Sequence, residues 1–186
     1  MGTSPLTLHA APAAGFDQPF EMLGACHDRV RRSLALLERL AAHLAAQGAD
    51  DPARSAAADV RRYFDVAAPA HHEDEERHVL PALRATGDRT LVQLAARLHE
   101  DHRRMAAAWA LARPALADLA EGRPWTPAHS AEGVAAWRAF AALYVDHLEA
   151  EDATAFPAAR AGLGPAAQAS MGQEMAARRG VKAMPT

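Results

Sequence analysis

The sequence has little of the chemistry that builds disulfide frameworks, zinc clusters or membrane spans. It contains one cysteine, Cys26, so neither an intramolecular disulfide nor a cysteine-based zinc cluster forms within one chain, and we expect a reducing compartment. No stretch approaches the roughly 18 uncharged apolar residues of a spanning helix, and the first residues show no basic segment followed by an apolar core. We therefore expect a cytoplasmic protein with no membrane partner.

Strong charge and strand-forming patterns are also scarce. The 20 basic and 23 acidic residues leave a net charge of -3, which does not favour a nucleic-acid partner. Only 5% of the residues are aromatic, no window alternates like a strand, and Ala, Leu, Arg and Glu dominate. With 186 residues, the chain is expected to form one all-α domain.

Apolar residues at helical spacing, separated by Gly and Pro, predict helices over residues 16–47, 52–84, 88–121 and 128–160. Pro69 and Pro81 should bend the second helix or mark its end. Short connections make neighbouring helices antiparallel, so we expect an up-down-up-down four-helix bundle. The bundle would occupy residues 17–160, after a leader of residues 1–16 and before a tail or short helix of residues 161–186.

The abundant residue of interest is histidine, with ten copies in the chain. Imidazole is a common metal ligand, so the positions of these histidines decide how they are interpreted. His72 and Glu76 are four residues apart, as are His147 and Glu151. Each pair therefore shares one helix face, a turn apart.

A spacing of 75 residues strengthens this observation. It separates three pairs of the same residue type, namely His27 and His102, His72 and His147, and Glu76 and Glu151. Prolines follow nearly the same spacing, because Pro81 lies five residues past Glu76 and Pro157 lies six past Glu151. The repeat indicates an internal duplication of a helical hairpin.

Two such hairpins, packed about a pseudo-twofold axis, would bring six potential ligands to the middle of the bundle: His27, His72, Glu76, His102, His147 and Glu151. Imidazole nitrogens combined with carboxylate oxygens suit iron, and the set is too large for one zinc ion. We therefore predict a dinuclear metal site, with manganese or zinc as possible substitutes for iron.

The four segments that carry these residues, PFEMLGACHDRV, HHEDEERHVLPAL, LHEDHRRM and YVDHLEAEDATAFPAAR, resemble the metal-bearing stretches of hemerythrin-like, or HHE cation-binding, domains. The resemblance covers roughly residues 17–160. It implies a four-helix bundle with two iron ions (Fe), oxo- or hydroxo-bridged, that meets oxygen, peroxide or nitric oxide. The same six residues are the ligands that it implies.

The sequence departs from the oxygen-carrying hemerythrins at one ligand. Those proteins have a histidine four residues before the position of His102, where this chain has Leu98. His99, three residues before His102, either supplies a fifth histidine or faces solvent. Without a fifth histidine, both irons keep an exchangeable position, which favours reactivity over reversible oxygen carriage.

We expect the remaining candidates to be structural. Cys26 should pack as a small buried hydrophobe, and Tyr144 should pack in the core near the metal face, with a possible hydrogen bond to a metal-bound ligand. Solvent exposure or loop packing is expected for five other histidines: His9, His43, His71, His78 and His129.

The leading functional hypothesis is a di-iron protein that binds oxygen, peroxide or nitric oxide for sensing, scavenging or turnover. Its ligand is a small molecule, the protein is a monomer or homodimer, and enzymatic turnover of peroxide or nitric oxide stays open. The alternative is iron storage, sensing or delivery. A metal-free helical scaffold is a third interpretation, which the intact repeat disfavours.

Overall fold

A computed structural model describes residues 15–181, except for the side chains of residues 127–130, and all secondary structure in this range is helical. The all-α prediction is confirmed. The elements are α1 (Pro19–Gln47), α2 (Asp51–Arg62), the π-helical turn η1 (Tyr63–Ala67), α3 (Ala68–Asp74), the π-helical turn η2 (Glu75–Val79), α4 (Leu80–Ala85), α5 (Arg89–Ala120), α6 (Pro127–Ala142), α7 (Tyr144–Ala150), the π-helical turn η3 (Glu151–Ala155), α8 (Phe156–Gly162) and α9 (Pro165–Arg178). These bounds lie close to those of the predicted helices.

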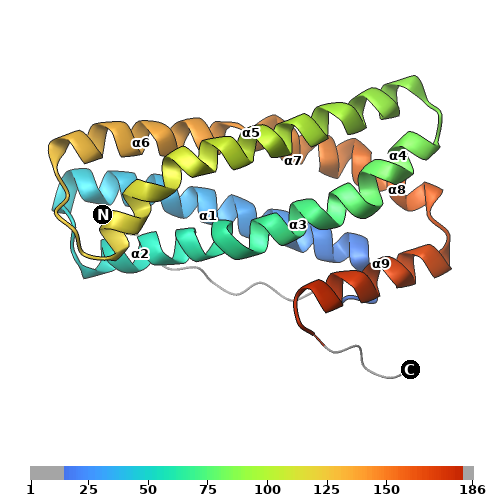
Figure 1. Cartoon of the computed structure of the whole chain (residues 1–186), viewed down its shortest axis with the longest axis horizontal. Helices are drawn as coiled ribbons and strands as arrows, with labels where there is room; N and C mark the ends of the chain where they lie inside the picture. Colours follow the sequence, from blue (N-terminus) through green and yellow to red (C-terminus); the bar gives the residue numbers. More distant parts are fainter. Residues whose placement is uncertain (1–14, 182–186) are drawn as a thin grey trace, which may run out of the picture.

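The elements between the main connections form long helical stretches that lie side by side (Figure 1). α1 packs on α2 and α6, and α5 packs on α2, α4 and α6. The connections after α1, α4 and α5 contain Gly48, Gly87 and Gly122, each with a positive φ that favours glycine. The chain therefore reverses at short turns, and residues far apart in the sequence become neighbours.

The π-helical turns follow from the prolines. Proline lacks an N–H, and its ring clashes with the carbonyl four residues earlier, so a regular α-helical turn is disfavoured there. Pro69, Pro81 and Pro157 each come directly after the residue whose N–H closes an i→i+5 hydrogen bond. The wider turn accommodates the proline without ending the helix. The predicted distortion at Pro69 and Pro81 thus takes the form of a π turn.

Two apolar clusters fill the interior, and a polar layer separates them. On α1, Leu23 belongs to one cluster and Val30 to the other, with the buried His27 between them. α5 shows the same pattern in the same order, because Leu98 and Met105 flank His102. Burial of apolar side chains on both sides stabilises the fold and keeps water away from this layer.

Outside these stretches, α9 docks against α1 and α3 through the fully buried Met171 and Met175. The predicted tail or short helix is therefore a helix, and Figure 1 shows it across one end of the molecule. The predicted leader falls almost entirely on residues outside the described range. No helix within residues 15–181 is long and apolar enough to cross a membrane.

Candidate metal centre

Among the described residues, seven potential metal ligands meet in the polar layer, and all except the partly buried His72 are buried. They come from every long helical stretch: His27 on α1, His71 and His72 on α3, Glu75 at the start of η2, His102 on α5, His147 on α7 and Glu151 at the start of η3. They form three overlapping groups, and the donor atoms within each group lie within 4.8 Å of one another.

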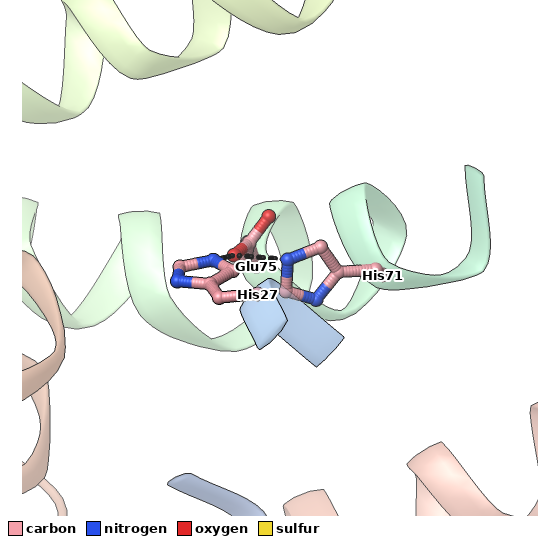
Figure 2. Close-up of side chains that lie close together, drawn as sticks. All are labelled: His27, His71 and Glu75. Carbon is pink, nitrogen blue, oxygen red and sulfur yellow. Dashed lines mark ion pairs between the residues drawn. The ribbon is translucent and has the colours of Figure 1, made fainter. Parts of the chain in front are cut away.

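Glu75 connects two of these groups. Its Oε1 lies 3.1 Å from Nε2 of His71 and 3.6 Å from Nε2 of His27. Its Oε2 lies 3.5 Å from Nε2 of His102 on the other side. Figure 2 shows the imidazole rings of His27 and His71 converging on the Glu75 carboxylate. The two oxygens of one carboxylate therefore face two different sets of histidines.

Glu151 has a similar position on the opposite hairpin. Its Oε2 lies 3.2 Å from Nε2 of His27 and 3.1 Å from Nε2 of His147, and its Oε1 lies 3.9 Å from Nε2 of His102. Two carboxylates and five imidazoles thus share one small volume. This arrangement can hold two cations side by side, with carboxylates between them.

Outer carboxylates orient three of the histidine rings. His27 donates from Nδ1 to Asp152 at 2.7 Å, and His102 donates from Nδ1 to Glu76 at 2.9 Å. An ion pair of 3.6 Å joins Nδ1 of His147 to Asp101. Each contact directs Nε2 inward and leaves its lone pair available for a metal.

The structure brings together five of the six residues predicted from the sequence. Glu76 is the exception, because its carboxylate contacts the outward Nδ1 of His102 and its side chain is 37% exposed. Its neighbour Glu75 points inward instead. The expectation of exposure or loop packing is wrong for His71, whose side chain is 2% exposed and contacts Glu75.

The prolines carried the signal for the correct alignment. Pro81 and Pro157 are 76 residues apart rather than 75, and the π-helical turns that precede them start at Glu75 and Glu151, also 76 apart. Aligned on the prolines, His71 corresponds to His147. The spacing of 75 residues between the histidines therefore pointed to Glu76 in place of Glu75. The two glutamates are hard to distinguish, because Glu76 lies four residues after His72 and Glu75 lies four after His71.

Burial keeps several of the imidazoles neutral in the metal-free protein. It lowers the pKa of His72 to about 3 and that of His102 to about 4, and it holds the pKa of His71 well below the usual 6.5. A neutral imidazole is the form that binds a metal. For His27, burial acts in the same direction, but contacts with the carboxylates of Asp152, Glu151 and Glu75 raise its pKa to about 11.

The two inner carboxylates differ in how their charge is accommodated. Burial and the nearby charge of Glu151 raise the pKa of Glu75 well above its usual 4.5. Burial would also raise the pKa of Glu151, but contacts with His147 and His27 lower it overall. Without a cation, the layer favours one ionised carboxylate and disfavours a second.

Donor atoms without partners show that the cluster fits a metal. Six donor and acceptor atoms of the cluster are buried within residues 15–181, namely Nε2 of His27, Nε2 of His102 and the four carboxylate oxygens of Glu75 and Glu151. None of these atoms makes a hydrogen bond of normal geometry in that range. Buried polar atoms of this kind are uncommon in native proteins and call for a ligand. Cations would satisfy the lone pairs and compensate the carboxylate charge.

The other candidates lie outside the cluster. His99 is half exposed, and its Nδ1 lies 3.4 Å from Glu76, which shows it facing the outer carboxylate. Cys26 is partly buried, and its backbone carbonyl accepts a hydrogen bond from Tyr63. Tyr144 is buried as predicted, with its ring 6.4 Å from that of His72. His43 and His78 are partly exposed, whereas His9 and the side chain of His129 lie outside what the structure describes.

Comparison with known proteins agrees with this geometry. The fold and the cluster define a helical cation-binding domain, and residues 18–159 match the hemerythrin HHE cation-binding domain. The chain belongs to this family, as the sequence motifs predicted. An uncharacterized protein of Haemophilus influenzae is 37% identical over 70 residues, which is 38% of this chain and 41% of that relative. The family match ends before α9.

Proposed function

We propose that the chain folds as an up-down-up-down four-helix bundle that holds two iron ions in the polar layer. The proposed ligands are His27, His71, His72, Glu75, His102, His147 and Glu151. The observation that carries this proposal is the position of Glu75, because its two oxygens face different histidines at 3.1 and 3.5 Å. A carboxylate placed in this way suits two metals better than one.

The division of the histidines supports an unequal pair of sites. His27 and His71 lie with Oε1 of Glu75, whereas His102 lies with its Oε2. His72 groups with Glu75 and His102, and His147 groups with His102 and Glu151. If the carboxylates of Glu75 and Glu151 each bridge the two irons, one iron has two histidine ligands and the other has three. The iron with two histidines then has more room for an exchangeable ligand.

The surroundings favour a small ligand such as oxygen, peroxide or nitric oxide. The polar layer lies between two apolar clusters, and the ring of Phe156 stacks on that of His27 at 4.9 Å. These apolar side chains limit the access of water to the layer, which suits a small ligand. When bound, the iron pair would supply electrons and Lewis acidity, which suits sensing, scavenging or turnover of such oxidants.

Iron storage or delivery is the second candidate function. It requires metal to leave the protein, whereas six of the seven proposed ligands are buried. A chelator under reducing conditions distinguishes the two functions. We expect slow release, over hours, from a protein that uses its metal in place, and rapid release with retained helical content from a storage or delivery protein.

The neighbouring glutamates provide a matched test of the site. We expect the wild-type protein to bind two irons per chain after anaerobic loading with ferrous iron. Glu75→Gln should lose at least one of them, because the amide cannot bridge as an anion. Glu76→Gln should keep both, with at most about a tenfold loss of affinity, since Glu76 only orients His102. Metal analysis after gel filtration measures the difference.

Two outcomes would contradict the proposal. Iron at one equivalent or less in the wild-type protein would rule out a dinuclear centre. Loss of iron in Glu76→Gln with full retention in Glu75→Gln would reverse the assignment of the ligand. Oxidant binding is tested separately, by visible spectra of the reduced, loaded protein before and after exposure to oxygen, peroxide or nitric oxide. An unchanged spectrum with all three would leave only the iron-handling function.

A further inference from the structure

A buried carboxylate next to the metal cluster takes no part in the cluster itself. Asp74 is fully buried on α3 and directly precedes Glu75. Arg178 donates from Nε to Asp74 Oδ1 at 2.7 Å, and a terminal nitrogen of Arg179 lies 2.6 Å from Oδ2. Asp74 therefore faces Arg178 at the end of α9 and Arg179 directly after it, whereas Glu75 faces the histidines.

The two arginines are themselves largely buried, with side chains that are 16% and 22% exposed. A buried carboxylate without a partner is strongly destabilising, because its charge is left uncompensated. The pairing with Arg178 and Arg179 offsets this cost. The contacts of Asp74 with these two arginines therefore tie α3 to the C-terminal end of α9.

α9 has its own anchors, which are independent of these ion pairs. Met171 and Met175 are fully buried. At Gly172 the helix approaches the chain before α1 so closely that a Cβ would lie 1.9 Å from the carbonyl oxygen of Phe16. The arginines are thus presented from a docked helix, and they can hold Asp74 in a defined position.

The position of Asp74 matters because the helix geometry changes immediately after it. η2 begins at Glu75, and its i→i+5 hydrogen bond runs from Leu80 N–H to the carbonyl of Glu75. A shift of one residue in the register of a helix rotates side chains by about 100°. Such a rotation would turn the Glu75 side chain out of the polar layer and bring a neighbouring side chain into it. An anchor at Asp74 opposes it.

We propose that Arg178 and Arg179 are positioning residues for the metal centre, which act through Asp74 to keep His71 and Glu75 pointed into the polar layer. This role rests on the proposed function and extends it to α9, which lies beyond the family match of residues 18–159. The C-terminal helix is then part of what retains the metal in this protein.

The test uses the whole chain loaded with cobalt(II). The visible bands of the bound cobalt report the ligand geometry, and the release of cobalt to excess chelator is followed over time. We expect the double variant Arg178→Gln/Arg179→Gln to release cobalt at least about tenfold faster than wild type, with altered visible bands and unchanged helical content. Arg178→Lys/Arg179→Lys keeps the charges and should stay within about threefold of wild type.

Two further variants separate positioning from general destabilisation. Asp74→Asn in the double-glutamine background removes the unpaired buried charge, so release should slow again toward the wild-type rate. Arg138→Gln breaks a 3.2 Å ion pair with Glu38 on the exposed surface and should release cobalt at the wild-type rate. If the double variant does not fold, Arg179→Gln alone takes its place, with at least about a threefold acceleration expected.

The outcomes are distinguishable from those of the proposed function. A wild-type protein that takes up no cobalt or iron contradicts the metal centre itself. Wild-type protein that binds two metals, together with a double-glutamine variant that releases them at the same rate and with the same visible bands, overturns only the role of Arg178 and Arg179. Equal acceleration in Arg138→Gln would also overturn it.

Discussion

The two π-helical turns η2 and η3 carry equivalent parts of the metal centre. Each begins with an inward glutamate, Glu75 or Glu151, and each ends one residue before the helix that contains Pro81 or Pro157. The proline accounts for the π turn, and the π turn places the glutamate. A local backbone distortion therefore recurs where the chain presents its two inward carboxylates.

The residue after each glutamate is equivalent as well. Glu76 follows Glu75 and accepts a hydrogen bond from His102 on α5, and Asp152 follows Glu151 and accepts one from His27 on α1. Each hairpin thus orients the buried histidine on the first helix of the other hairpin. The approximate twofold relation extends beyond the cluster to the carboxylates that surround it.

The four residues that precede each turn differ between the two turns at two positions. His72 before η2 corresponds to Leu148 before η3, which gives one side of the centre an additional imidazole. Asp74 corresponds to Ala150, which has no charge, so the ion pairs of Asp74 with Arg178 and Arg179 have no counterpart before η3. The repeat provides two similar sets of potential ligands, and these substitutions make the two sets unequal.

The largest expected effect comes from making the two turns alike. His72→Leu copies Leu148 and removes one imidazole from the group of three, so metal content should fall from two irons per chain toward one. Metal analysis combined with native mass spectrometry measures this. Retention of two irons with unchanged affinity would mean that His72 is not a ligand.

The metal-free protein provides a second test, because the extra histidine titrates. Burial lowers the pKa of His72 to about 3, below its usual 6.5, so the unfolded chain binds more protons between pH 4 and 6. Stability is therefore lost as the pH falls through this window. His72→Leu should make the loss shallower by about 1.4 kcal/mol per pH unit. Urea unfolding across the window gives the slopes, and Leu148→Met should leave the wild-type slope unchanged.

The smallest effect is expected from the outer carboxylates. Asp152→Asn weakens the hydrogen bond that orients His27, and metal affinity should fall about tenfold. Glu76→Gln is its counterpart on the other hairpin and should have a similar effect. Competition with a chelator of known affinity compares the two variants. A large effect of one and none of the other would break the twofold relation.

Much of the centre was predictable because helical periodicity is a local property. Helix-forming composition and apolar spacing predicted the helices, and the repeated histidines predicted that they share one layer. The choice between adjacent residues was harder. His71 with Glu75 and His72 with Glu76 have the same spacing of four, so the pattern of the helix alone does not distinguish them.

The sequence by itself determined that this chain is helical and that it belongs to a cation-binding family. It also predicted five residues that the structure brings together: His27, His72, His102, His147 and Glu151. Only the tertiary structure decided that Glu75 rather than Glu76 points inward, that His71 joins His72, and that α9 pairs with Asp74. The physical reason is that a π turn rotates every side chain near it, and that long-range docking places α9. The repeated prolines mark where the π turns form, but the helical spacing of four fits Glu75 and Glu76 equally, and no repeat predicts the docking of α9.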